Sequence, residues 1–273
     1  MDIVRAMLAT GEHAGRTRPL AEVDHKLRSV GTPLVDAIEE QLARRRPVSV
    51  LEIGFGWGRA LLELAWRFRA EPVRFAGINL EREPPMEGPA DLPAVAEALE
   101  IVPPAELGRF RWPEVHFYDA TTLHVADASL DFVYSVVSIR FIADKARVIE
   151  EVARALRPGG RAILDIGEPG WEYPAGPATD PVMLTPHPCR IVVHRDLELV
   201  PLVDHLTAAA GDRFTIRVPT GRRCVIDMRR NAPGPLDLGL ALDEERTIPM
   251  RRFPHPRPKG AGGIRSAYRI VSG

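Results

Sequence analysis

The fold of this chain is decided by one stretch, Val50-Leu51-Glu52-Ile53-Gly54-Phe55-Gly56-Trp57-Gly58. A short apolar run ends in three glycines at every second position, and the residues from Arg59 to Ala65 then have the composition of a helix. A buried strand, a tight turn and a helix N-terminus in this order are typical of a doubly wound sheet that holds a nucleotide-like ligand. A dinucleotide-binding loop would need its third glycine at position 59, which is Arg59, so the spacing favours a different cofactor.

Strands and helices alternate along most of the chain. The pair Thr32-Pro33 predicts a helix start with Thr32 as the N-cap. We expect strands at about 48–53, 73–79, 115–118, 132–136 and 161–166, helices at about 58–69, 146–156 and 197–210, and a final hairpin at 214–228. This alternation predicts an α/β fold, in which helices cover both faces of a doubly wound, seven-stranded and mostly parallel sheet.

The composition bounds the class of protein. The chain has 273 residues, of which 45% are hydrophobic and 27% charged, and its net charge is -1. These values are typical of a globular protein that does not bind nucleic acid or a membrane, and the default location is the cytoplasm. The eight histidines are scattered, and Cys189 and Cys224 lie far apart in no ligand-like spacing. We therefore expect neither a metal site nor a disulfide framework.

Three segments together resemble one enzyme family. The pattern Glu-x-Gly-x-Gly-x-Gly at 52–58 is similar to the first motif of the class I S-adenosylmethionine-dependent methyltransferases. The segments Asp119-Ala120-Thr121-Thr122-Leu123 and Leu156-Arg157-Pro158-Gly159-Gly160 resemble later motifs of that family, in the right order. The resemblance covers about 34–230 and implies a Rossmann-like methyltransferase fold with S-adenosylmethionine as the cofactor.

The resemblance also implies which residues contact the cofactor. The glycine loop would lie against the methionine part, because glycines let the backbone approach closely and the following helix presents free N–H groups to a carboxylate. Asn79 stands where the family usually has an acidic ribose ligand, and Asp119 would accept from the adenine amino group. The expected cofactor-binding residues are Glu52, Gly54, Phe55, Gly56, Gly58, Asn79, Leu80, Asp119, Ala120 and Ser135.

The sequence does not identify the catalytic residues. Many members of the resembled family carry histidines after the fourth strand, where this chain has Ile139-Arg140-Phe141, so a histidine base at this position is excluded. Arg140 could hold a substrate anion, or it could be a salt-bridged residue at a helix start. Glu168, His187 and His194 lie in a loop-rich insertion where substrate pockets are built, and each is a weak candidate for a general base.

We expect three parts of the chain. These are an N-terminal helical cap at 1–31, a methyltransferase domain at 32–230 with insertions at about 83–113 and 167–195, and a C-terminal tail at 231–273 in which only 266–271 is strand-like. The predicted function is direct in-line methyl transfer to an oxygen, nitrogen or carbon atom of a small molecule. A peptide or protein carboxyl methyltransferase is an alternative. A non-catalytic cofactor-binding regulatory protein is another, and a nicotinamide oxidoreductase is a more distant one.

Overall fold

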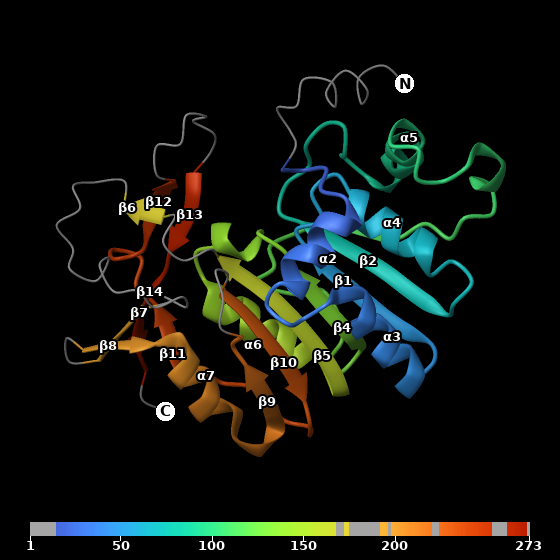
Figure 1. Ribbon diagram of the computed structural model, residues 1–273. Helices are drawn as coiled ribbons and strands as arrows, with labels where there is room; N and C mark the ends of the chain where they lie inside the picture. The colour runs from blue at the N-terminus through green and yellow to red at the C-terminus, as the bar shows by residue number, and fades with distance from the viewer. Residues whose placement is uncertain are drawn as a thin grey trace.

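A seven-stranded sheet runs through the centre of the protein (Figure 1). The computed structural model describes residues 15–167, 172–174, 192–195, 198–219, 224–252 and 261–271. The strand order of the central sheet is β3-β2-β1-β4-β5-β10-β9. Its strands are β1 (Val48–Ile53), β2 (Val73–Asn79), β3 (Glu114–Phe117), β4 (Leu130–Ser135), β5 (Leu156–Gly167), β9 (Phe214–Arg217) and β10 (Cys224–Arg230).

The pairing of these strands confirms the predicted sheet. Strands β1 to β5 run parallel to their neighbours, and β10 alone is antiparallel to β5 and to β9. The last two strands are the predicted hairpin at 214–228. Because β1 lies between β2 and β4, the strand order reverses at β1, and doubly wound sheets bind ligands at such a switch point, beyond the carboxyl ends of the strands.

Helices cover both faces of the sheet, as predicted. One face packs against α2 (Leu20–Arg28), α3 (Leu34–Arg44), α4 (Arg59–Arg67) and α5 (Leu92–Ala98), and the other against α6 (Lys145–Ala155) and α7 (Leu202–Ala210). A hydrophobic core lies on each face of the sheet. Successive side chains of a strand point to opposite faces, so Phe132 and Tyr134 of β4 enter the first core and Val133 enters the second. Short 3-10 turns are η1 (Pro89–Asp91), η2 (Pro104–Glu106), η3 (Ile139–Phe141) and η5 (Gly211–Arg213).

The prediction that Thr32 is an N-cap was wrong. The N-cap residue of α3 is Pro33, and the Thr32 hydroxyl donates to the Leu27 carbonyl at the end of α2. The free N–H groups of Leu34 and Val35 donate instead to the Asp24 carboxylate, at 2.8 and 3.1 Å. The cap of α3 therefore comes from the preceding helix, which the local pattern does not show.

The insertion at 167–195 and the C-terminal extension form two further sheets. In one, β12 (Ile248–Arg252) lies between β6 (Glu172–Pro174) and β13 (Ala261–Arg265); the other has the order β11-β14-β7-β8. Its strands are β7 (Val192–Arg195), β8 (Glu198–Pro201), β11 (Leu240–Leu242) and β14 (Ala267–Ile270). Only β14 was predicted, because the other strands depend on partners far away along the chain.

The C-terminal extension is bonded to the start of α6. The Tyr268 hydroxyl, in a fully buried side chain, accepts from the Ala146 N–H at 3.0 Å. The Lys145 ammonium donates to the Ile264 carbonyl at 2.6 Å and to the Ser266 hydroxyl at 2.9 Å. Burial lowers the pKa of Lys145 to about 7. Through these contacts the C-terminal extension is held against α6, and Tyr268 belongs to the second core.

Two other local predictions were wrong. The helix expected at 197–210 begins only at Leu202, because residues 198–201 form β8 against β7. Cys224, at the start of β10, is disulfide-bonded, which the spacing of the cysteines did not suggest. Cys189, the other cysteine of the sequence, lies outside the described residues. Within the described ranges, no helix is long and apolar enough to cross a membrane.

Candidate functional site

The predicted glycine loop is a tight turn between β1 and α4. Gly54, Gly56 and Gly58 have φ angles of 78°, 59° and 82°, a region that favours glycine because it has no Cβ. Gly58 is also the N-cap residue of α4, so the free N–H groups at the helix N-terminus follow directly from the turn. These groups and the helix dipole favour an anionic group such as a carboxylate.

Two of these glycines are also required by the protein's own chain. A Cβ on Gly54 would stand 2.1 Å from the Ser138 Cβ, and one on Gly56 would stand 2.6 Å from the Arg16 carbonyl oxygen. The Ser138 hydroxyl donates to the Gly54 carbonyl at 3.0 Å, and the Arg16 carbonyl accepts from the Trp57 N–H at 2.9 Å. The segment after β4 and the segment before α2 therefore both touch the glycine turn.

Asn79, at the end of β2, holds the glycine turn in place. Its side-chain oxygen accepts from the Gly56 N–H at 3.2 Å, and its amide group donates to the Gly56 carbonyl at 2.8 Å. An amide oxygen has two lone pairs, so a ribose hydroxyl can use only the second. The sequence predicted a ribose ligand at Asn79 and missed this role in shaping the turn.

An apolar side chain and a carboxylate follow the ends of two neighbouring strands. Leu80 comes directly after β2 and is 66% exposed. Asp119 follows β3 and is also exposed, and its Oδ1 accepts from the Thr121 N–H at 2.9 Å. Because β2 and β3 are parallel neighbours, both residues lie at the same edge of the sheet as the glycine turn.

Glu52 is a buried carboxyl group two residues before the turn. Its Oε2 accepts from the Tyr134 hydroxyl at 2.8 Å, and the two residues are opposite each other on β1 and β4. Burial raises the pKa of Glu52 to about 8, although the Tyr134 hydrogen bond acts in the opposite direction. A carboxyl group in this place is ionised at neutral pH only if a cation lies beside it.

Three of the expected cofactor residues have their side chains in the core. The Phe55 ring is 6.0 Å from the Phe117 ring, and a Cβ on Gly77 would come within 2.8 Å of it. Ser135 is fully buried and donates to the Ile53 carbonyl at 2.9 Å, and Ala120 is 6% exposed. We therefore expect Phe55, Ser135 and Ala120 to meet a ligand through backbone groups. The sequence did not indicate why Gly77 is a glycine: an added Cβ would lie 2.8 Å from both the Phe55 ring and Leu61 Cδ2.

The turn after β4 contains a backbone conformation that is rare for its residue type. Val137 has φ 73°, which is strained for a β-branched residue. Its N–H donates to Asp165 Oδ2 at 3.1 Å, and Asp165 is fully buried near the end of β5. Strained residues held by their surroundings cluster at functional sites. The only sign of this contact in the sequence was the carboxylate of Asp165 within the otherwise apolar run 162–166.

The structure describes two of the weak catalytic candidates, Arg140 and His194, which lie in different elements. Arg140 lies in η3 and is 1% exposed, with its guanidinium 5.5 Å from the centre of the Phe141 ring. Glu168 and His187 are outside the described residues, and His194 lies in β7 of a smaller sheet. Among the residues that the structure describes, no group of three His, Cys, Asp or Glu side chains is placed to hold a metal ion.

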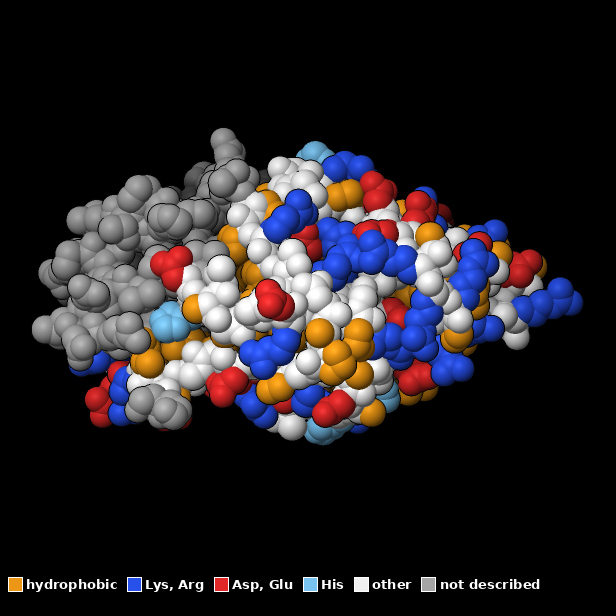
Figure 2. Space-filling model, turned by 90° about the horizontal axis from the view of Figure 1, so that it is seen from below, with side chains coloured by type: hydrophobic (Ala, Val, Ile, Leu, Met, Phe, Trp, Pro, Cys, Tyr) orange, Lys and Arg blue, Asp and Glu red, His pale blue; other side chains and the backbone are white. Residues whose placement is uncertain are grey.

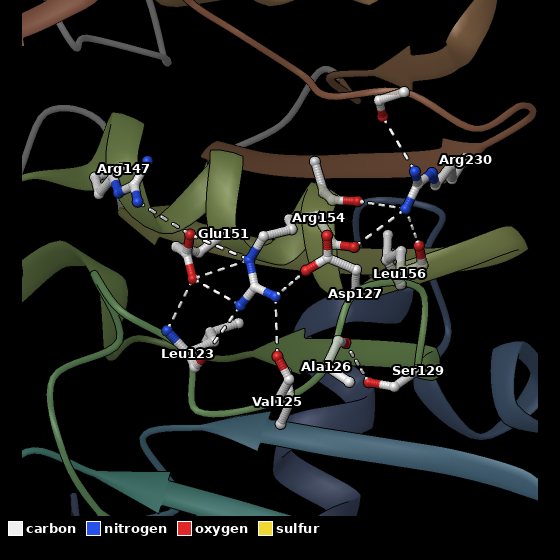
Figure 3. A network of polar contacts seen from close by, with 12 residues as sticks. Leu123, Val125, Ala126, Asp127, Ser129, Arg147, Glu151, Arg154, Leu156 and Arg230 are labelled. Carbon is white, nitrogen blue, oxygen red and sulfur yellow. Dashed lines mark hydrogen bonds and ion pairs between the residues drawn. The ribbon is translucent and has the colours of Figure 1, made fainter.

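An ionic clamp holds the loop that follows Asp119 against α6 (Figure 3). Arg154 donates to the carbonyls of Leu123 and Val125, at 2.8 and 2.9 Å. Glu151, which is buried, accepts from the Leu123 N–H at 3.0 Å and from Arg154 at 2.8 Å. Arg154 therefore positions the loop at the sheet edge that carries Asp119.

Removing this clamp is expected to loosen the loop. Arg154→Ala should lower the free energy of unfolding by about 2 kcal/mol, because buried backbone groups lose their partners. It should also weaken the binding of S-adenosylhomocysteine about fivefold through local opening of the loop. Urea unfolding and calorimetric titration measure the two effects.

Arg147→Ala is the matched control on the same helix. Arg147 is half exposed and is within ion-pair distance of Glu150 and Glu151, at 3.6 and 3.2 Å, so a change below about 0.5 kcal/mol is expected. Equal effects of the two variants would show that Arg154 does not hold the loop.

Known proteins match the part of the chain that contains these features. A family model described as a methyltransferase domain matches residues 51–164. Methyltransferase GfsG of Streptomyces halstedii is 30% identical over 166 residues, which are 60% of this chain and 54% of that protein.

Two further relatives match over a similar stretch. The 27-O-demethylrifamycin SV methyltransferase of Amycolatopsis mediterranei is 30% identical over 50% of this chain and 45% of that protein. The malonyl-[acyl-carrier protein] O-methyltransferase of Xylella fastidiosa is 32% identical over 48% of this chain and 38% of that protein. The chain thus spans about half, or less, of the length of these relatives. Residues 51–164 match a methyltransferase domain, and this match supports a class I S-adenosylmethionine-dependent methyltransferase fold for that part of the chain.

Proposed function

We propose that this chain is an S-adenosylmethionine-dependent methyltransferase that acts on a small molecule. The observation that carries the proposal is the glycine turn, in which three residues with positive φ lead from the switch point of the sheet into the N-terminus of α4. We also propose that the catalytic domain spans 32–230, with 1–31 as a cap and 231–273 as an extension.

The residues present fit S-adenosylmethionine. The N-terminus of α4 suits the carboxylate of the cofactor, and the buried Glu52 carboxyl group suits its ammonium group. Leu80 offers an exposed apolar surface for the adenine ring, and Asp119 an acceptor for its amino group. The second lone pair of Asn79 Oδ1 is an acceptor for a ribose hydroxyl. The backbone of Gly54 to Gly58 would line the methionine part.

The proposed chemistry asks little of the protein beyond alignment. Bound S-adenosylmethionine supplies a methyl group on a positively charged sulfur, which is already activated toward nucleophiles. The remaining task is to align the acceptor with that methyl group. The turn at Val137 and Ser138 touches the glycine turn and is held by Asp165, so we assign the positioning of the acceptor to it. A general base is needed only for an acceptor that is protonated at the working pH.

We favour an oxygen atom as the acceptor. One relative named above is called an O-methyltransferase, and the name of another refers to a demethylated oxygen position. A peptide carboxyl methyltransferase would need an accessible cation for the acidic group, and Arg140 is 1% exposed, which favours a structural role for it. Small-molecule O-methylation therefore remains the better supported proposal.

The test uses the purified full chain with radiolabelled S-adenosylmethionine. We expect micromolar binding of S-adenosylhomocysteine in calorimetric titration, no binding of NAD, and label transfer to members of a panel of hydroxyl and carboxyl metabolites. Tight NAD binding would overturn the assignment. Binding of S-adenosylhomocysteine without transfer to metabolites, peptides or proteins would favour the regulatory alternative. Transfer to peptides alone would favour the carboxyl methyltransferase.

A further inference from the structure

A small hollow lies where β5, β10 and β9 run side by side. Arg161, Thr215, Arg217, Asp227 and Arg229 line this arginine hollow, whose volume is about 140 Å³. Pockets for whole small molecules are roughly 300–1,000 Å³, so the hollow suits a single functional group. Figure 2 looks at the protein from below and shows Lys and Arg side chains gathered on this face.

The arginine hollow is separate from the glycine turn. Arg161 pairs in register with Phe132, near the start of β4, whereas the glycine turn follows the carboxyl end of β1. The hollow therefore lies toward the amino ends of the parallel strands, and a ligand in it would not contact the proposed cofactor site.

The register of the sheet brings two arginines together. Arg229 on β10 is directly opposite Arg161 on β5 and directly opposite Thr215 on β9. Asp227, two residues before Arg229 on the same face of β10, is opposite Arg217. Like charges directly opposite each other on neighbouring strands repel, and the Glu40 carboxylate relieves part of this repulsion, because it accepts from Arg161 at 3.2 Å and from Arg229 at 2.9 Å.

Acidic neighbours neutralise only part of this charge. Asp227 accepts from Arg161 at 2.8 and 3.0 Å and from Arg217 at 3.1 Å. Burial opposes its ionisation, but these hydrogen bonds outweigh burial and lower the pKa of Asp227. Three guanidinium groups and one carboxylate give the lining a charge of +2. Glu40 on α3, which accepts from both Arg161 and Arg229, reduces this excess to one positive charge.

One nitrogen of a residue that lines the hollow has no partner. Among the residues that the structure describes, Arg229 Nη1 makes no hydrogen bond and is shielded from solvent; an unmade bond of a buried donor is costly, and a small rotation of the guanidinium group would be needed for a ligand to reach it. Guanidinium groups fork onto phosphate oxygens, and several donors around one hollow suit a group with more than two oxygens. We propose that the arginine hollow binds a phosphate group, either of inorganic phosphate or of a phosphomonoester.

The experiment titrates the full chain with inorganic phosphate in a calorimeter at low ionic strength, with glycerol 3-phosphate as a second probe. We expect saturable binding of phosphate that weakens about tenfold or more in Arg229→Gln, and less in Arg229→Lys, which keeps the charge but not the fork. Equal binding of glycerol 3-phosphate identifies a phosphomonoester as an acceptable source, and its exclusion identifies free phosphate.

Arg45→Gln is the matched control for charge. Arg45 is exposed, follows α3 directly and does not line the hollow, so it should change phosphate affinity less than about twofold. Thr215→Val removes a lining hydroxyl without changing the charge. It therefore tests the hollow without the misfolding that loss of an arginine ion pair could cause. Absence of saturable heat, or equal weakening by Arg45→Gln and Arg229→Gln, would overturn the site.

Discussion

Replacing Glu52 by glutamine is expected to stabilise the cofactor-free protein at about pH 8 while weakening its binding of S-adenosylhomocysteine. The Glu52 pKa rises from 4.5 to about 8 in the fold, because the carboxyl group is buried. The unfolded chain ionises this group above pH 4.5, whereas the folded chain resists its ionisation. The contribution of Glu52 to the free energy of unfolding is therefore complete below pH 4.5, the pKa of this group in the unfolded chain. It is lost as the pH rises toward 8.

The neutral amide of Glu52→Gln removes this pH dependence and keeps an acceptor for the Tyr134 hydroxyl. We expect the variant to be more stable than the parent by about 4 kcal/mol near pH 8 and by little near pH 4. Its affinity for S-adenosylhomocysteine should fall about tenfold or more, because a cofactor ammonium loses its counter-charge. Urea unfolding at the two pH values and calorimetric titration check both effects.

Two results would contradict this account. A stability difference that does not change with pH would show that Glu52 does not titrate in this range. Unchanged affinity would remove Glu52 from the cofactor site. Tyr134→Phe serves as a further check: it deletes the hydrogen bond that lowers the Glu52 pKa, so it should extend the pH range in which Glu52 stays neutral.

The second large effect is expected at Gly54. Gly54→Ala adds a Cβ 2.1 Å from the Ser138 Cβ and Oγ, at a φ of 78°. The conformational strain is worth about 1–2 kcal/mol, and overpacking adds about 1–3 kcal/mol. Because the clash lies between the glycine turn and the turn after β4, cofactor binding should be lost together with stability.

Gly54 offers a rescue experiment. Ser138→Gly removes the side-chain atoms that the new Cβ meets, and the next atom, the Ser138 Cα, lies at 3.6 Å. The double variant should therefore recover about 1–3 kcal/mol of the lost stability and part of the cofactor affinity. Gly31→Ala is the matched control, since Gly31 has φ 77° but nothing within 4 Å of an added Cβ. It isolates the strain from the clash.

Gly56 differs from Gly54 in one respect. An added Cβ there meets the backbone carbonyl of Arg16 at 2.6 Å, so no side-chain substitution relieves it. Gly56→Val should abolish cofactor binding, and no second substitution should restore it.

The Gly54 experiment has a contradicting outcome. If the Gly54→Ala/Ser138→Gly double variant recovers neither cofactor affinity nor stability, the Ser138 contact is not what excludes a side chain at Gly54.

Much of the central sheet could be predicted because its signals are local. Strands β1 and β2 lie in short runs of apolar residues that the sequence shows directly, although β5 begins at Leu156, before the expected start at 161. Strands that depend on distant partners could not be predicted this way. The C-terminal segment 248–252 becomes a strand by pairing with 172–174 and 261–265, and no pattern within it indicates those partners.

The expected site residues divide in the same way. Leu80 and Asp119 were expected from the family resemblance, and both are exposed at one sheet edge. The side chains of Phe55 and Ser135 are instead in the core, because packing from Gly77 and a bond to Ile53 hold them there. Whether a side chain is buried depends on which distant parts of the chain pack against it. The position of a residue within a motif does not reveal that packing.

From the sequence we predicted the sheet class, through the alternation of strands and helices, and the cofactor family, through a resemblance that includes the spacing of Gly54, Gly56 and Gly58. That spacing acts locally, since it sets the backbone of one turn at the start of one helix. Folding then brings Ser138 and Arg16 against this turn, and burial together with the Tyr134 hydrogen bond sets the pKa of Glu52. The physical reason is that close approach and desolvation arise between residues distant along the chain, and they exist only once it is folded.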